Sequence, residues 1–159
     1  MKELAKKLGT ALCSRAAVLA TAESCTGGWA AQAVTAIPGS SAWFERGFVT
    51  YSNAAKMELL GVREATLQTR GAVSEDTARE MALGALERSA ATVALAITGI
   101  AGPDGGTAEK PVGTVCFAWA QKERAVKSET RRFAGDREAV RRQSVEHALR
   151  GVLKALDAG

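Results

Sequence analysis

The chain has 159 residues, of which 47% are hydrophobic and 24% charged, and its formal net charge is +4. This length and composition are ordinary for one globular domain with a sizeable core, so we expect a single domain over residues 1–159. No apolar run is long enough to span a membrane, and the charged residues 1–8 contain no signal-peptide core. We therefore expect a cytoplasmic protein with no membrane partner.

Cysteine and histidine are used sparingly. Cys13, Cys25 and Cys116 are odd in number and scattered, which is typical of reduced thiols rather than of a disulfide framework. His147 is the only histidine, and no pair of cysteines has metal-ligand spacing. This usage argues against a catalytic zinc ion.

The hydrophobic pattern predicts helices and strands in alternation. An amphipathic helix at 3–15 is followed by a strand at 17–22, a helix at 27–37, a strand at 44–51, a short helix at 53–60 and a helix at 74–90. Strands are then expected at 92–98, 112–120 and 125–133, before a final helix at 136–156. This alternation indicates a layered α/β domain, and the adjacent last two strands indicate an antiparallel hairpin in a mixed, mostly parallel sheet.

The run Ala-Glu-Ser-Cys-Thr-Gly-Gly at residues 22–28 lies between the first strand and the following helix. Ser24, Cys25 and Thr26 place hydroxyl and thiol groups at a helix start, where unpaired N–H groups favour anions and developing oxyanions. Gly27 and Gly28 allow the backbone to approach a ligand closely. One interpretation is a nucleophile or phosphate site, and the other is a tight turn whose Ser or Thr only caps the helix.

A second cluster surrounds the expected short helix at 53–60. Asn53 is a plausible N-cap, which places Lys56 near the third position of this helix. A lysine in the first turn faces the unfavourable end of the helix dipole. It either points into solvent or acts as a neutral base that benefits from this placement.

A Gly-rich loop follows the apolar strand at 92–98 and contains Gly99 and Gly102. Loops at the carboxyl ends of buried strands bind ligands in open α/β sheets, so we expect a ligand site here. The glycines match neither a Walker A motif nor a dinucleotide fingerprint, and the pattern therefore does not name the ligand.

Arginines gather in the last third of the chain. They are Arg131, Arg132, Arg137, Arg141, Arg142 and Arg150. Nucleic-acid binding is one interpretation, but aromatic residues are scarce and are not interleaved with these arginines, so we expect no nucleic-acid partner. For most of them we expect a solvated helix face shared with glutamates, with one or two available to a small anion.

Motifs along nearly the whole chain resemble the CinA C-terminal domain family. They are residues 22–28, Pro-Gly-Ser-Ser at 38–41, Phe-Val-Thr-Tyr-Ser-Asn at 48–53 with Lys56, Gly-Ala-Val-Ser-Glu at 71–75, the loop 98–106 with Lys-Pro-Val-Gly-Thr at 110–114, and Gly-Asp-Arg at 135–137 with Arg141. The resemblance implies a three-layer α/β/α sandwich that commonly forms a homo-oligomer. It also implies hydrolysis of the amide of nicotinamide mononucleotide (NMN) to nicotinate mononucleotide and ammonia, in pyridine nucleotide salvage, without a metal or cofactor.

The resemblance implies roles for individual residues as well. Ser24 is expected as the nucleophile and Lys56 as its base, while Tyr51 assists the proton transfer or orients Lys56. The residues expected at the substrate are Cys25, Thr26, Gly27, Gly28, Thr98, Gly99, Gly102 and Arg141. Cys25 is also a rival nucleophile, because a helix start lowers the pKa of a thiol, but the family position favours Ser24.

General chemistry is compatible with a Ser–Lys mechanism. A serine needs a base, and a lysine base must lower its pKa from about 10.4 to roughly 7–8, a change of about 4 kcal/mol. A substrate pyridinium at roughly 6 Å contributes on the order of 3 kcal/mol at an effective dielectric of about 20, and burial supplies the rest. The alternatives are a non-catalytic nucleotide-binding or competence-related protein and, less favoured, a nucleic-acid-binding domain.

Overall fold

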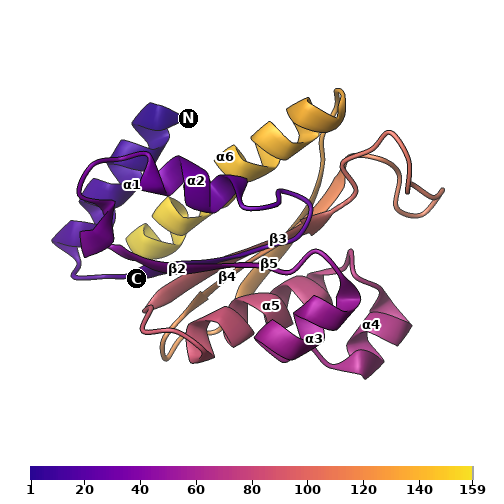
Figure 1. Cartoon of the computed structure of the whole chain (residues 1–159), viewed down its shortest axis with the longest axis horizontal. Coiled ribbons are helices and arrows are strands. Elements are labelled where there is room, and N and C mark those ends of the chain that lie inside the picture. The colour runs from indigo at the N-terminus through magenta and orange to yellow at the C-terminus, as the bar shows by residue number, and fades with distance from the viewer. Residues whose placement is uncertain (159) are drawn as a thin grey trace.

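The computed structural model describes residues 1–158 and contains one β-sheet covered by helices on both faces (Figure 1). In chain order the elements are α1 (Lys2–Ser14), β1 (Leu19–Glu23), α2 (Trp29–Thr35), the 3-10 helix η1 (Ser40–Ala42), β2 (Phe44–Val49), α3 (Asn53–Leu60), α4 (Glu64–Arg70), α5 (Glu75–Glu87), β3 (Val93–Gly99), β4 (Thr114–Gln121), β5 (Lys127–Arg132) and α6 (Arg137–Ala158). Within residues 1–158, no helix combines the length and the apolar character that a membrane crossing requires.

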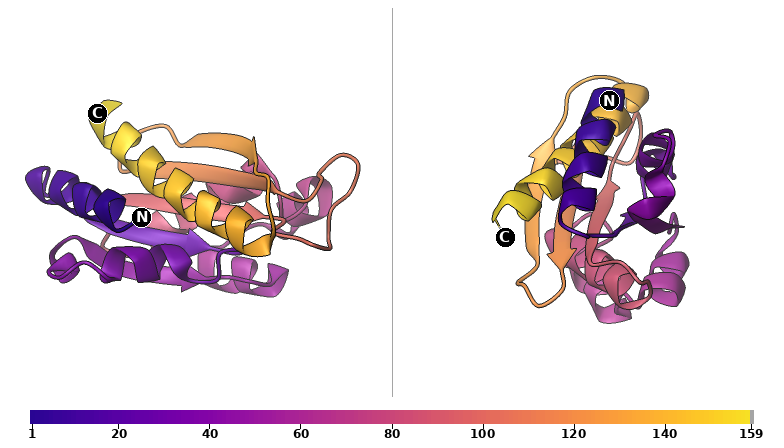
Figure 2. Two further views of the ribbon diagram at one scale, coloured as in Figure 1. Left: turned by 90° about the horizontal axis from the view of Figure 1, so that it is seen from above. Right: turned by 90° about the vertical axis from the view of Figure 1, so that its left-hand side faces the viewer.

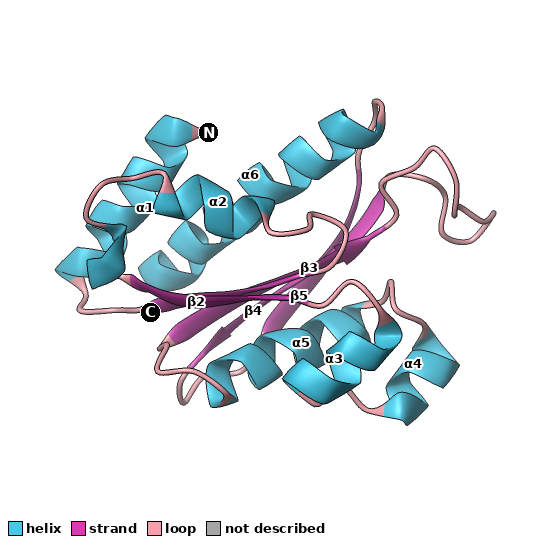
Figure 3. Cartoon of the chain, viewed as in Figure 1, coloured by secondary structure: helices cyan, strands magenta, loops and turns pink. Residues whose placement is uncertain are grey.

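The strands lie in the order β2-β1-β3-β4-β5. β1 pairs in parallel with β2 and β3, whereas β4 pairs antiparallel with β3 and β5. Four strands therefore run in one direction and β4 runs against them, which confirms the mixed, mostly parallel sheet and its antiparallel final hairpin. Figure 3 shows the sheet between two layers of helices, so the three-layer sandwich is confirmed as well.

The two faces of the sheet carry side chains of different size. Leu95, Ile97 and Phe117 belong to the core under α1, α2 and α6, the layer drawn above the sheet in Figure 1. Ala96 and Ala118 alternate with them along the strands and belong to the core on the opposite face, which α3, α4 and α5 cover. The alternation of side chains along a strand produces this segregation. The small side chains allow α5 to lie close to β3 and β4.

Two short helices, α4 and η1, and the N-cap of α3 differ from the predicted elements. α4 fills the stretch between α3 and α5, where the pattern predicts no element. It has 7 residues, and so short a segment presents too little apolar periodicity to be recognised. The N-cap of α3 is Ser52, whose hydroxyl accepts a hydrogen bond from the Ala55 N–H, rather than Asn53.

α3 is held against α5 by a close approach of their backbones. A Cβ atom added at Gly84 of α5 would lie 1.9 Å from the carbonyl oxygen of Leu60, the last residue of α3. Only glycine permits this approach, because any side chain would overlap the Leu60 backbone. Val62 and Met81 belong to the apolar core of this face. The contact fixes the position of the helix that carries Lys56.

Gly84→Ala should therefore destabilise the fold, although alanine normally favours a helix over glycine by about 1 kcal/mol. The added methyl group has to displace α3, and overpacking of this kind costs about 1–3 kcal/mol. Chemical denaturation measures the change in the free energy of unfolding. Leu83→Ala on the exposed side of α5 is the control and should cost less. A Gly84→Ala protein more stable than the wild type would contradict the close approach.

Candidate active site

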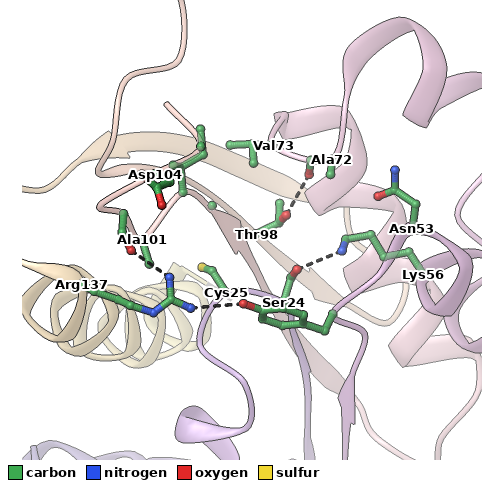
Figure 4. Close-up of a pocket in the computed structure, with 15 residues that line it drawn as sticks. Ser24, Cys25, Asn53, Lys56, Ala72, Val73, Thr98, Ala101, Asp104 and Arg137 are labelled. Atoms are coloured by element: carbon green, nitrogen blue, oxygen red, sulfur yellow. Dashed lines mark hydrogen bonds between the residues drawn. The ribbon is translucent and has the colours of Figure 1, made fainter. Parts of the chain in front are cut away.

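The site lies at the carboxyl ends of β1 and β3. From β1 the chain passes to β2 on one side and later to β3 on the other side, so these two strand ends border a topological switch point. Open α/β sheets bind ligands in such crevices. A cleft of about 270 Å³ opens here, and its lining includes Ser24, Lys56 and Thr98 (Figure 4). A larger hollow of about 690 Å³ beside α1 has a single charged side chain in its lining, Lys6.

Ser24 and Lys56 form the central contact of the cleft. Lys56 Nζ donates one hydrogen bond to Ser24 Oγ and another to the Thr50 carbonyl, each over 2.9 Å. Both side chains are buried, with relative exposures of 8% for Ser24 and 1% for Lys56. The pair, joined by a dashed line in Figure 4, has the geometry of a hydroxyl beside an amine that can take its proton.

Strand alternation explains why Ser24 meets α3. Residue 24 continues the path of β1, since its N–H donates a hydrogen bond to the Ile97 carbonyl of β3. Ala22 faces the layer of α3, α4 and α5, so Ser24, two residues later, faces it too. Glu23 points to the other layer, where it contacts α2. Lys56 reaches Ser24 from the first turns of α3, which begins just beyond β2.

Lys56 is buried, and no carboxylate among residues 1–158 compensates its charge. In the described part of the chain its amine makes hydrogen bonds to a hydroxyl and a carbonyl but forms no ion pair. Burial disfavours the ammonium form and lowers the pKa of Lys56 below its ordinary value of 10.5. Only a Cys25 thiolate opposes this change in pKa, and that thiol is protonated at neutral pH.

Cys25 lines the same cleft but is a poor nucleophile there. Burial raises the pKa of the Cys25 thiol to about 12, and the carboxylate of Glu23 adds to the rise. The thiolate is the reactive form, so a thiol that keeps its proton at neutral pH is inert. The lowering of the pKa expected from a helix start is thus outweighed by burial.

Tyr51 and Arg137 meet at the mouth of the cleft. The Tyr51 side chain has a relative exposure of 63%, and its hydroxyl accepts a hydrogen bond from Arg137 over 3.2 Å rather than contacting Lys56. Arg137 also donates to the Gly102 carbonyl over 2.8 Å. This arginine, the first residue of α6, therefore links the segment after β2 to the loop after β3 (Figure 4).

The loop after β3 forms one wall of the cleft. It extends beyond the sheet, as Figure 2 shows. Thr98, Gly99 and Gly102 all line the cleft. The Thr98 hydroxyl donates to the Ala72 carbonyl over 2.8 Å and so ties β3 to the segment before α5. Its oxygen can still accept one hydrogen bond from a ligand.

Four residues expected at the substrate lie outside the lining. They are Thr26, Gly27, Gly28 and Arg141. The guanidinium of Arg141 donates to the Cys25 carbonyl over 3.1 Å and to the Thr26 carbonyl over 3.2 Å. It also lies 5.5 Å from the centre of the Trp29 ring. In this arrangement Arg141 braces the segment that carries Ser24 from the side of α6.

The N-terminus of α2 is not an open anion site, contrary to the expectation of unpaired N–H groups there. The carboxylate of Glu23 accepts hydrogen bonds from the Ala30 N–H over 2.8 Å and from the Ala31 N–H over 3.1 Å. The Trp29 N–H donates to the Thr26 carbonyl. These donors are therefore already paired within the protein.

His147 lies away from the cleft. Its ring packs among Phe117, Trp119 and Phe133 and hydrogen-bonds to Glu129 over 3.0 Å. It therefore does not contact Ser24. Among residues 1–158, no group of three or more His, Cys, Asp or Glu side chains is arranged to hold a metal ion.

Sequence reasoning missed three polar residues of the lining, namely Asn53, Asp104 and Arg137. Each lies inside a motif that was recognised, at 48–53, 98–106 and 135–137. The motifs marked the right segments, but which side chain in each segment faces the cleft depends on the topology. Arg137 and Arg141 are both arginines of the same segment and lie one helical turn apart, so the sequence pattern alone does not distinguish them.

The buried amine predicts how stability changes with pH. Because the pKa of Lys56 is lower in the folded protein than in the unfolded chain, the unfolded chain binds more protons between the two pKa values. This residue therefore makes the wild type more stable as the pH rises toward 10.5. Lys56→Met should fold, and its stability relative to the wild type should fall over the same range. Denaturation midpoints of both proteins from neutral pH to pH 10.5 measure this, and a constant difference would contradict the lowered pKa.

Known proteins share both the sequence pattern and the architecture of this chain. The family model of the CinA C-terminal domain matches residues 1–156. Nicotinamide-nucleotide amidohydrolase PncC of Escherichia coli K12 is 56% identical over 149 residues, which cover 94% of this chain and 90% of that protein. The protein of the same name from Enterobacter agglomerans is 56% identical over 154 residues, covering 97% and 94%.

Solved structures share the fold. The competence/damage inducible protein CihA from Agrobacterium tumefaciens superposes with a TM-score of 0.94 at 49% identity, covering 98% of this chain and 94% of that one. A CinA superfamily protein from Klebsiella pneumoniae superposes with a TM-score of 0.95 at 41% identity, covering 99% and 98%. The chain belongs to the CinA C-terminal domain family.

Proposed function

We propose that this protein hydrolyses the carboxamide of NMN to nicotinate mononucleotide and ammonia. The observation that carries the proposal is the buried hydrogen bond between Lys56 Nζ and Ser24 Oγ at the switch point of the sheet. The names of the relatives that are 56% identical support the substrate. Burial of a lysine without a carboxylate partner is costly and lowers its pKa, and pKa values perturbed in this way cluster at functional sites.

In the first step Ser24 Oγ attacks the amide carbon of NMN. Lys56, in its neutral form, keeps its hydrogen bond to the Thr50 carbonyl and accepts the Ser24 proton. The resulting tetrahedral oxyanion collapses, the C–N bond breaks, and Lys56 returns the proton to the departing nitrogen, which leaves as ammonia. The product of this step is an ester between Ser24 Oγ and the carboxyl group of nicotinate mononucleotide.

The backbone N–H of Cys25 is a donor available to the oxyanion. It donates to no oxygen atom of residues 1–158, whereas the Ser24 N–H is bonded to Ile97. A donor on the residue after the nucleophile can stabilise a charge that develops only during the reaction, and a fixed dipole stabilises such a charge most strongly. In the second step Lys56 takes a proton from water, the water oxygen attacks the ester carbon, and nicotinate mononucleotide is released as Ser24 regains its proton.

Arg137 is the best-placed residue for the substrate phosphate. It lines the cleft, whereas the N–H groups of Arg141 that are described above are directed to the backbone behind Ser24. A guanidinium matches the oxygens of a phosphate dianion. The contact of Tyr51 with Arg137 favours a role for this phenol at the phosphate end, while its assistance to Lys56 stays a prediction.

The first test is hydrolysis of NMN by the purified protein in the presence of EDTA, with detection of ammonia and nicotinate mononucleotide. Ser24→Ala should lower kcat by more than about a thousandfold, because it removes the attacking atom. It should still bind NMN in calorimetry. Cys25→Ala is the matched control from the same turn and should keep most of the activity, because its thiol is protonated.

Two outcomes would overturn the mechanism. One is an inactive Cys25→Ala protein beside an active Ser24→Ala protein, which would make the thiol the nucleophile. The other is activity that EDTA abolishes and a divalent ion restores. A wild type that binds NMN and releases no ammonia would instead support the non-catalytic alternative.

The second test separates the two arginines. Arg137→Ala should raise KM for NMN by about 10- to 100-fold, the range of a lost charge-assisted hydrogen bond, and should change KM for nicotinamide riboside little. Arg141→Ala should lower kcat on both substrates alike, because it loosens the segment that carries Ser24. The reverse result would assign the phosphate to Arg141.

A further inference from the structure

Glu23 is a buried carboxylate that the proposed mechanism leaves without a task. It has no exposed surface, and no other Asp or Glu among residues 1–158 is buried. It forms no ion pair with a lysine or arginine of the described chain. A charge in this position is tolerated only when hydrogen bonds replace the lost water.

Those hydrogen bonds come from Thr26, in the turn after β1, and from the first turn of α2. One carboxylate oxygen of Glu23 accepts the Thr26 hydroxyl over 2.6 Å and the Ala30 N–H over 2.8 Å. The other oxygen accepts the Ala31 N–H over 3.1 Å. The carboxylate at the end of β1 is thereby connected to Thr26, three residues further on, and to the first turn of α2.

This arrangement differs from an ordinary helix cap. A capping side chain comes from the N-cap position, which in α2 is Gly28, with a φ of 105° and no side chain. Glu23 instead reaches the helix from the preceding strand. The hydrogen bond between the Glu23 and Thr26 side chains closes a ring that contains Ser24 and Cys25, the two residues between them.

The ring also determines which way the nucleophile points. Glu23 is held on the α2 side of the sheet, and alternation along the strand then directs Ser24 to the α3 side, toward Lys56. The Ser24 N–H is fixed on the Ile97 carbonyl at the same time. If the turn moved at Thr26, the Ser24 side chain would rotate about the hydrogen bond between its own N–H and the Ile97 carbonyl.

We propose that the hydrogen bond between Glu23 and Thr26 is a positioning contact that holds Ser24 Oγ within reach of Lys56 Nζ. The proposal rests on Ser24 being the nucleophile of the proposed function. Neither Glu23 nor Thr26 touches the substrate, because neither lines the cleft. Their effect is on the attack distance, and a displacement of about 1 Å at a reacting group can lower a rate about a hundredfold.

The test compares Thr26→Val, which keeps the shape but removes the hydroxyl, with Thr26→Ser, which keeps the hydroxyl. Each protein is assayed for NMN hydrolysis and for the rate at which a small sulfonyl fluoride labels Ser24, measured by mass spectrometry. Thr26→Val should lower kcat and the labelling rate together by about 10- to 100-fold while KM for NMN stays nearly constant. Thr26→Ser should recover most of both rates.

Thr35→Val on the same helix is the control, since its hydroxyl bonds only to backbone carbonyls of its own helix. It should change neither rate. Circular dichroism at the assay temperature confirms that each variant is folded. Unchanged kcat and labelling in folded Thr26→Val would overturn the proposal, and so would a rise in KM with kcat unaffected.

The two readouts separate this inference from the proposed function. A wild type that is labelled at Ser24 but does not hydrolyse NMN disproves the proposed substrate, while the labelling rates of the Thr26 variants still decide the positioning role. A wild type that is neither labelled nor active overturns both, because Ser24 would then not be a nucleophile.

Discussion

A lysine amine is buried beside a serine hydroxyl, and no carboxylate of residues 1–158 balances its charge. This is the constraint around which the domain is arranged. The ammonium form is unfavourable in such a place, so the site lowers the pKa of Lys56 at the expense of stability. The pKa of Lys56 stays low only if its amine cannot move out of the cleft into solvent. The helix α3 is therefore fixed by Gly84 of α5, and α5 by the alanine face of the sheet.

The layered fold was accessible from the sequence because its signals are strong and local. Short, continuous apolar runs such as the one containing Ile97 have the length of buried strands, and they alternate with longer amphipathic segments that have the period of a helix. α4 was not accessible, because 7 residues carry too little pattern. The cap of α3 was misassigned by one position, since Ser52 and Asn53 are both good capping residues.

The candidate site was accessible in part. Ser24 and Lys56 stood out because each lies at a strand–helix junction, and the structure brings them into contact. Whether Arg137 or Arg141 faces the cleft depends on where α6 begins relative to the loop after β3. No local sequence pattern reports this position. The role of Glu23 was hidden for a similar reason, since its partners lie up to 8 residues away on α2.

The reactivity of Cys25 has a consequence for oxidative chemistry. Oxidation by peroxides begins at the thiolate, and burial holds the pKa of this thiol at about 12. Sulfenic acid formation at Cys25 is therefore suppressed although the residue lies next to Ser24, the proposed nucleophile. A serine hydroxyl has no comparable oxidation chemistry, so the proposed Ser24 nucleophile would stay intact under conditions that inactivate a cysteine hydrolase of the same shape.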